Sequence, residues 1–268
     1  MKQTYFNIPL DLCYYAVRNK KFRLLRLYLL LKQNSNGILR LETEAIQELT
    51  KKIGYKSVRS LFNNLDELIN MNWVGYNSRS RFYFIRSFNN VLSQLNIAKL
   101  RRKGALLKYE HIENLEAFLI SVILEDLYTK IRWKKRQELA REFKKGRAFQ
   151  VLADSIVYVE ISCKYLAKVL DISISTAYKY KQLAFKSGMI DIMKNIKPLN
   201  VSPVMLFHIN KSVPEYKGRF RKHGGGVGVV CSDKVRTNIK LLRRKKTNDI
   251  KKGVYKRGAS SDDQIHPA

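Results

Sequence analysis

The sequence predicts a mainly α-helical protein with small β-hairpins (an α+β fold), built from two domains with one shared order of elements. Three observations support this fold class. Residues 5–90 and 113–210 each show helical apolar spacing, a short β-branched run, two short helices and two strand-like runs. A chain of 268 residues is long enough for two domains. Beyond residue 210 the apolar periodicity fades, and glycine, lysine and arginine become frequent, which is typical of a disordered tail.

The first segment begins with two helical stretches, at 8–19 and 20–33, the second of which Gly37 is suited to end. Residues 38–41 are a strand candidate. Two helices then follow, and the first of them ends at Gly54. Their inward apolar residues are Ile46, Leu49, Ile53, Val58, Leu61, Leu65 and Leu68. Aromatic and β-branched runs on either side of residues 77–80 complete the segment as a β-hairpin.

The second segment repeats this order. Residues 114–143 predict a long helix whose C-terminal half is very basic, and 156–161 predict a strand. A helix with Leu166, Val169 and Leu170 on one face precedes a turn and a second helix, Ser175 to Lys186. Residues 188–209 are interpreted as two strands joined by a turn that contains Pro198.

These patterns divide the chain into four parts. We expect a first domain over 1–95, a basic connector over 96–112, a second domain over 113–210 and a basic tail over 211–268. The tail is expected to be disordered, with one short helix at Val235 to Lys246, and its glycine run is interpreted as a flexible linker.

The charge of the chain points to a polyanionic partner. Lysine and arginine number 52 against 22 aspartate and glutamate, a net charge of +30. Such an excess repels itself in the folded state, so DNA, RNA or an anionic membrane is the expected partner. The apolar run 24–31 is too short to span a bilayer and contains Arg26, so we interpret it as a core helix. Membrane binding through Trp133 and Phe143 of the basic helix is the lesser alternative.

Cysteine and histidine usage predicts a non-enzymatic cytoplasmic protein. Cys13, Cys163 and Cys231 are odd in number and far apart, and the N-terminus lacks the pattern of a secretory signal. The histidines form no metal-binding spacing with them. The glycine run lacks the Gly-Lys-Ser/Thr of a phosphate-binding loop. We therefore expect no catalytic residue, metal, cofactor or small-molecule ligand, and no membrane partner.

Residues 166–180 resemble the helix-turn-helix of DNA-binding proteins. An apolar–small pair is followed by an apolar residue, a turn, an apolar plug, a serine cap and inward residues of the second helix. The matching residues are Leu166, Ala167, Leu170, Ile172, Ser173, Ala177 and Tyr180. Asp171 replaces the glycine often found at the turn, and aspartate tolerates the left-handed conformation. With the flanking helix and strands, this order resembles the winged helix-turn-helix class.

The resemblance implies that the outward face of the second helix contacts DNA. This face has hydroxyls, an amide and lysines but no carboxylate, which suits a groove lined with phosphates. The candidates are Ser175, Thr176, Tyr178, Lys179, Gln182 and Lys186, together with Lys194 and Lys197 of the second predicted hairpin. A helix pair used only for packing is the alternative.

The first segment resembles the same class more loosely, with Gly54 at the turn and Thr50 where a smaller residue is usual. Its DNA-binding candidates are Lys56, Ser57, Arg59, Ser60 and Asn63 on the helix, and Arg79 and Arg81 in the hairpin turn. Asp66 and Glu67 would repel phosphate if they faced it. The alternative is a module for dimerisation or for binding a partner protein.

Tandem domains of this class resemble plasmid and phage replication initiators, which bind repeated sites at an origin. The resemblance implies sequence-specific binding of double-stranded DNA in the cytoplasm, on nucleoid or mobile-element DNA, with self-association or replication proteins as further partners. A transcriptional regulator at a promoter would need the same contacts. An RNA-binding or ribosome-associated basic protein is the alternative from another class.

Overall fold

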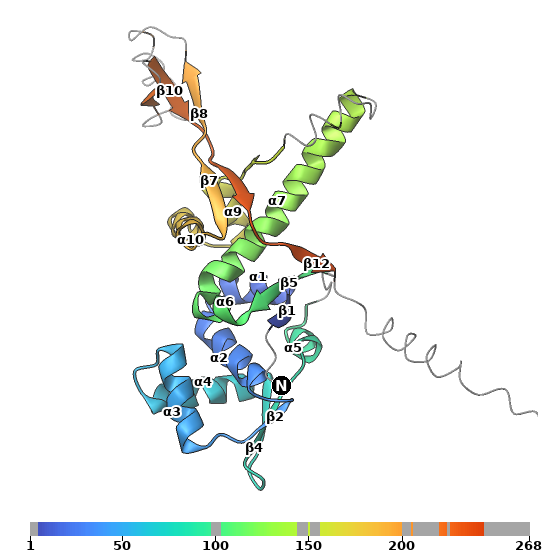
Figure 1. Ribbon diagram of the computed structural model, residues 1–268, viewed down its shortest axis with the longest axis vertical. Coiled ribbons are helices and arrows are strands. Elements are labelled where there is room, and N and C mark those ends of the chain that lie inside the picture. The colour runs from blue at the N-terminus through green and yellow to red at the C-terminus, as the bar shows by residue number, and fades with distance from the viewer. Residues whose placement is uncertain are drawn as a thin grey trace, which may run out of the picture. The chain divides into compact units, whose positions relative to one another are not determined.

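The computed structural model describes most of the chain, in several ranges (Figure 1). These are residues 5–97, 103–143, 150, 156–199, 205, 220–223 and 226–243. Within them the protein is of mixed helix and strand, and the strands form four antiparallel three-stranded sheets. The expectation of an α+β protein is confirmed at this level.

The chain divides into two compact units. Unit 1 contains the described residues among 1–16 and 21–113 and those from 240 onward, and unit 2 contains 17–20 and those among 114–239. Unit 1 is therefore discontinuous in sequence, since the chain leaves it and returns. This differs from the predicted division into two successive domains and a tail.

Unit 1 holds most of its elements in its first hundred residues. They are β1 (Tyr5–Pro9), α1 (Leu10–Arg18), α2 (Phe22–Gln33), β2 (Ile38–Leu39), α3 (Thr43–Ile53), α4 (Val58–Asn70), β3 (Val74–Asn77), β4 (Phe82–Ile85), α5 (Phe88–Gln94), β5 (Lys103–Lys108), α6 (Tyr109–Glu113) and β12 (Leu241–Arg243). The predicted helices, short strand and hairpin between residues 20 and 88 are confirmed. Residues 8 and 9, expected in a helix, belong to β1.

The core of unit 1 is built on α2, whose leucines are buried along almost its whole length, as expected of a core helix. Tyr28 of α2 packs edge-on against the fully buried Trp73, with ring centroids 5.5 Å apart. The Tyr28 hydroxyl donates to the carbonyl of Arg86 at 2.7 Å. On α4, Leu61, Leu65 and Leu68 are buried. Val58 is 39% exposed, so its predicted inward position is wrong.

Unit 2 begins with one long helix. Its elements are α7 (Leu115–Glu142), β6 (Val159–Glu160), α9 (Cys163–Leu170), α10 (Ile174–Lys186), β7 (Ile190–Met193), β8 (Ile196–Leu199), β9 (Phe220–His223), β10 (Gly226–Val230) and β11 (Lys234–Thr237). The N-terminal half of α7 is buried on nearly all sides, from Leu115 to Tyr128. The predicted helices are confirmed, whereas the strand expected at 156–161 is limited to β6.

The hairpin expected within residues 188–209 is wrong. β7 and β8 do not pair with each other: β7 pairs with β11, and β8 pairs with β10. Pro198 lies inside β8 rather than in a turn, opposite Gly228. Proline has no N–H to donate, and β8 is an edge strand of its sheet, where proline is tolerated. Their pairing partners, β10 and β11, come from the segment expected to be a disordered tail.

Two further expectations for the same segments are wrong. Residues 234–237 and 241–243 are strands β11 and β12, not part of a helix at Val235 to Lys246. The expected connector contains β5, which pairs with β1 on one side and β12 on the other, and α6. The glycine run interpreted as a linker extends into strand β10. The expectation of disorder at 211–219, 224–225 and 244–268 falls outside the described residues.

The two units share one arrangement of six elements. In each, a helix, a short strand, two helices and two further strands occur in this order: α2, β2, α3, α4, β3 and β4 in unit 1, and α7, β6, α9, α10, β7 and β11 in unit 2, where β8, β9 and β10 come between the last two. The strand order is also the same, with the last strand in the centre: β2-β4-β3 and β6-β11-β7. The last strand of the second set is thus β11, from the segment expected to be a tail, and not a strand of the hairpin expected within 188–209.

Candidate nucleic-acid interface

The turn between α9 and α10 has the predicted chemistry. Asp171 ends α9 in the left-handed conformation, with φ 55° and ψ 52°. Ser173 precedes α10, and its side chain accepts a hydrogen bond from the Thr176 backbone N–H at 3.1 Å. The inward positions Leu166, Leu170 and Ala177 are completely buried. These local signals orient α10 by one well-defined turn.

The outward face of α10 presents most of the predicted residues. Ser175, Lys179 and Lys186 are exposed, and Tyr178 is 54% exposed. Gln182 is half-buried but lies on the same face. The helix has no acidic residue. This face can therefore donate hydrogen bonds and attract anions along its length.

Two residues of the outward face differ from the sequence prediction. Thr176 is half-buried, and its hydroxyl lies 2.8 Å from that of Ser173, so it serves the cap more than the surface. Ile174 is 55% exposed and was not predicted as a site residue. It lies one turn before Tyr178, and the two form an apolar stretch at the start of the helix.

Sequence reasoning also missed Lys181, which is only 1% exposed. Its ammonium group donates to the carbonyl of Ile161 at 3.0 Å and to the Asp233 carboxylate at 3.2 Å. Asp233 directly precedes β11. This ion pair therefore fixes α10 to the chain next to β6 and β11. Lys181 lies four residues after the inward-facing Ala177, and this spacing could have placed it on the buried face of the helix. It was missed because lysine is rarely found in a protein core.

The other two predicted residues of unit 2 lie where two of the three-stranded sheets, β6-β11-β7 and β8-β10-β9, continue into each other. β7 and β8 form one side and β10 and β11 the other, joined midway by a 2.7 Å hydrogen bond from the Cys231 N–H to the Asn195 carbonyl (Figure 1). Lys194 and Lys197 are exposed on the ribbon that these four strands form. Both lysines thus lie on a continuous antiparallel ribbon rather than on the hairpin that the sequence predicted.

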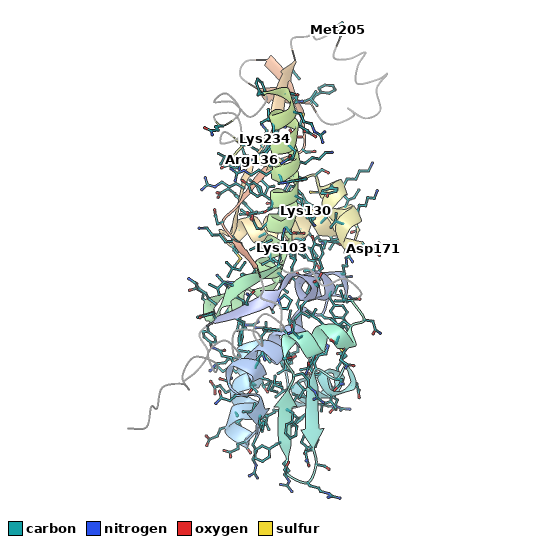
Figure 2. The ribbon with its side chains drawn as sticks, turned by 90° about the vertical axis from the view of Figure 1, so that its right-hand side faces the viewer. Lys103, Lys130, Arg136, Asp171, Met205 and Lys234 are labelled. Carbon is teal, nitrogen blue, oxygen red and sulfur yellow. The ribbon has the colours of Figure 1, made fainter. Side chains whose placement is uncertain are left out.

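The C-terminal half of α7 adds further basic side chains, including Lys130 and Arg136, which Figure 2 labels. Lys130 is paired with the buried Asp126 at 2.5 Å, so its charge is partly compensated. Lys134 is exposed, and Trp133 is 64% exposed. This end of the helix is a solvated, mostly positive surface.

In unit 1, α3 ends at Gly54 in the left-handed conformation (φ 77°), as predicted, and α4 begins after Ser57. Ser57 caps α4 by accepting from the Ser60 N–H at 3.3 Å, and the two hydroxyls lie 3.1 Å apart. Lys56, Arg59 and Asn63 are exposed. The structure thus brings the predicted residues together, with the two serines engaged in the cap.

The two acidic residues of α4, Glu67 and Asp66, differ in whether a cation compensates their charge. Glu67 is neutralised by Lys21 at 2.5 Å, and this hydrogen bond raises the pKa of Lys21. Asp66 is exposed.

The basic residues of the hairpin, Arg79 and Arg81, are exposed at its tip, where the Asn77 side chain accepts a hydrogen bond from the Arg79 N–H at 3.0 Å. The tip is thus a short, ordered, positively charged turn.

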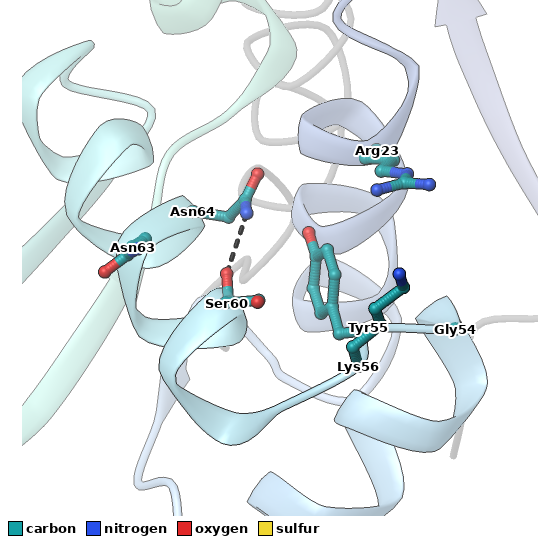
Figure 3. A pocket seen from close by; sticks show the side chains of 7 residues that line it. All are labelled: Arg23, Gly54, Tyr55, Lys56, Ser60, Asn63 and Asn64. Atoms are coloured by element: carbon teal, nitrogen blue, oxygen red, sulfur yellow. Dashed lines mark hydrogen bonds between the residues drawn. The ribbon is translucent and has the colours of Figure 1, made fainter.

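A hollow of about 370 Å³ lies beside the start of α4 (Figure 3). It is lined by Arg23, Gly54, Tyr55, Lys56, Ser60, Asn63 and Asn64. Three elements supply these residues: α2, the turn before α4, and α4 itself. The lining contains two cations and no carboxylate, and sequence reasoning did not find Arg23 or Tyr55.

The Tyr55 hydroxyl is buried and forms no hydrogen bond within the described part of the chain. Burial raises the pKa of Tyr55 to about 12; Arg23 and Arg26 act in the opposite direction, and the Glu67 carboxylate adds to the rise. The phenol therefore stays protonated at neutral pH and keeps an unused donor.

Two other kinds of feature, a metal site and a membrane-spanning helix, are absent from the described residues. No cluster of three histidine, cysteine, aspartate or glutamate side chains there could hold a metal ion. None of the helices within those ranges combines the length and apolar character that crossing a membrane requires. Comparison of the chain with protein-family models, curated proteins and solved structures yields no match.

Proposed function

We propose that this chain binds double-stranded DNA sequence-specifically through two winged helix-turn-helix domains, one in each unit, as a replication initiator of a plasmid, phage or other mobile element. One observation carries the proposal: α10 follows α9 through a short turn with a left-handed Asp171 and a Ser173 cap, and it presents an outward face without carboxylates. The net charge of +30 supports a polyanionic partner.

In this proposal α10 lies in the major groove, with its N-terminal residues near the base edges. Lys179 and Gln182 supply donors for guanine or adenine edges, and Ser175 contacts either bases or phosphate. Ile174 and Tyr178 offer apolar surface to thymine methyl groups. The buried Lys181–Asp233 pair supports this role because it holds α10 rigidly on the rest of unit 2.

The remaining basic surfaces contact the phosphate backbone. Lys194 and Lys197 of the ribbon and the basic end of α7 serve unit 2, and Arg79 and Arg81 serve unit 1. Such contacts fix register and raise affinity without reading sequence. The initiator role rests on the resemblance of the tandem arrangement to plasmid and phage replication initiators. The proposed cytoplasmic localisation rests on the number and spacing of the cysteines.

Lys179→Ala and Gln182→Ala are expected to weaken binding to the cognate duplex by about 1–3 kcal/mol each, if they contact bases. Binding to random duplex should change much less. Fluorescence anisotropy on both duplexes at one salt concentration measures the difference. Lys108→Ala is the matched control, since Lys108 is an exposed lysine on β5 paired with Glu110 at 3.4 Å. Equal losses on cognate and random duplex would show that these side chains do not read bases.

The cognate duplex is first obtained by selecting bound fragments from random and native DNA. Repeated sites clustered in native fragments are the result expected of an initiator, whereas single sites in promoters would instead indicate a transcriptional regulator. A competition between duplex DNA and structured RNA in one filter-binding assay tests the polymer itself. Preference for RNA would contradict the proposed function.

A further inference from the structure

We infer that the hollow of unit 1 beside the start of α4 is a binding site for a phosphate group. The phosphate belongs either to the DNA backbone, in which case the inference rests on and deepens the proposed function, or to a free nucleotide. Both sources share the same chemistry, a tetrahedral anion held by cations and neutral donors.

The charges of the hollow are uncompensated, unlike those around it. Within the described part of the chain, neither Arg23 nor Lys56 forms an ion pair, and no acidic residue lines the hollow. The neighbouring cations are paired: Lys21 with Glu67, and Lys52 with Glu48, each at 2.5 Å. Two cations from different elements that face one carboxylate-free hollow are expected to concentrate an anion there.

Neutral donors complete the site. The Tyr55 hydroxyl has no partner in the described residues, but protein atoms enclose it, so it is not among the donors that a phosphate in the hollow contacts directly. The Asn63 amide is exposed at the rim. The Asn64 amide donates one N–H to the Ser60 carbonyl at 2.7 Å, as the dashed line in Figure 3 shows, which leaves its second N–H for a ligand.

Position and size agree with this ligand. The hollow adjoins the N-terminal turn of α4, where the helix dipole favours negative charge. Its volume of about 370 Å³ is at the lower end of the range for small-ligand pockets, roughly 300–1,000 Å³. It can hold a phosphate with part of its sugar. The size therefore suits a phosphodiester unit or the phosphate end of a mononucleotide.

The test uses the full chain with Arg23→Gln and Lys56→Gln together. Lys52→Gln together with Lys108→Gln is the matched control, since this variant also removes two positive charges, both from ion pairs outside the hollow. If the phosphate is that of DNA, the double variant makes the negative slope of log affinity against log salt shallower by about 1–2. It also weakens binding to cognate and to random duplex equally. The control variant leaves the slope unchanged to within a few tenths.

A second measurement distinguishes the sources and does not depend on the variants. Titration of the wild-type protein with AMP and with adenosine, followed by NMR, separates phosphate binding from base binding. Shifts with AMP only, lost in the double variant, indicate a free nucleotide. An unchanged salt slope together with no response to AMP overturns the inference, even if Lys179 and Gln182 still confer sequence-specific binding.

Discussion

A chain truncated after residue 219 is expected to lose the cooperative unfolding transition of unit 2. The truncation removes β11, the central strand between β6 and β7, and with it the fully buried Val235. It also leaves the buried ammonium of Lys181 without Asp233. Burial of a valine is worth about 1.5–3 kcal/mol, and an unpaired buried charge costs about 3–5 kcal/mol. Their sum is comparable to the whole stability of a domain, about 5–15 kcal/mol. Urea unfolding followed by circular dichroism measures the loss.

A cooperative transition of wild-type amplitude in that truncated chain would mean that β11 is dispensable. Its control is the removal of 244–268 alone, which leaves every described strand in place. We expect this shorter deletion to keep the transition but to reduce the salt dependence of DNA binding, because it removes basic residues that include Arg244, Lys245 and Lys246. An unchanged salt slope would show that these residues do not contact DNA.

Asp233→Ala is expected to lower the free energy of unfolding by about 3 kcal/mol, near the low end for a broken buried ion pair because Asp233 is 25% exposed. The substitution leaves the Lys181 ammonium with the Ile161 carbonyl as its remaining partner among the described residues. Asp191→Ala is the matched control in the same sheet. Its partner Arg236 is 3.9 Å away and both side chains are about half exposed, so the loss should be about 1 kcal/mol or less.

Removing both charges tests the physical cause of that loss. In the Asp233→Ala background, Lys181→Met replaces the buried ammonium by an apolar side chain of similar length, and most of the lost stability should return. Chemical denaturation of the single and double variants completes the cycle. If Asp233→Ala costs no more than Asp191→Ala, the buried pair is not a determinant of stability.

The local elements of the two units could be predicted because their signals are short-range. Gly54 and Asp171 end helices in the left-handed conformation, and Ser57 and Ser173 cap the helices that follow. The hairpin around residues 77–80 needs only a polar turn between two aromatic runs. Each of these features is decided within a few residues along the chain.

The return strands could not be predicted because their partners are distant in sequence. β11 pairs with β6 and β7, whose nearest residues lie some forty positions earlier, and its one buried valine stands among basic residues. β10 alternates valine with glycine, which weakens its strand signal. Lys181 was missed for a related reason: what makes a buried lysine acceptable is Asp233, which lies in the same unpredicted segment.

The split of unit 1 has a consequence for its synthesis. β5 lies between β1 and β12, yet β12 is translated only after the described strands of unit 2. At usual translation rates the nascent chain carries β5 with one unpaired edge for on the order of ten seconds. An open edge invites pairing with strands of other chains. Lys103 and Lys108 at the two ends of β5 discourage such pairing, because lysines on an edge oppose the approach of a further strand.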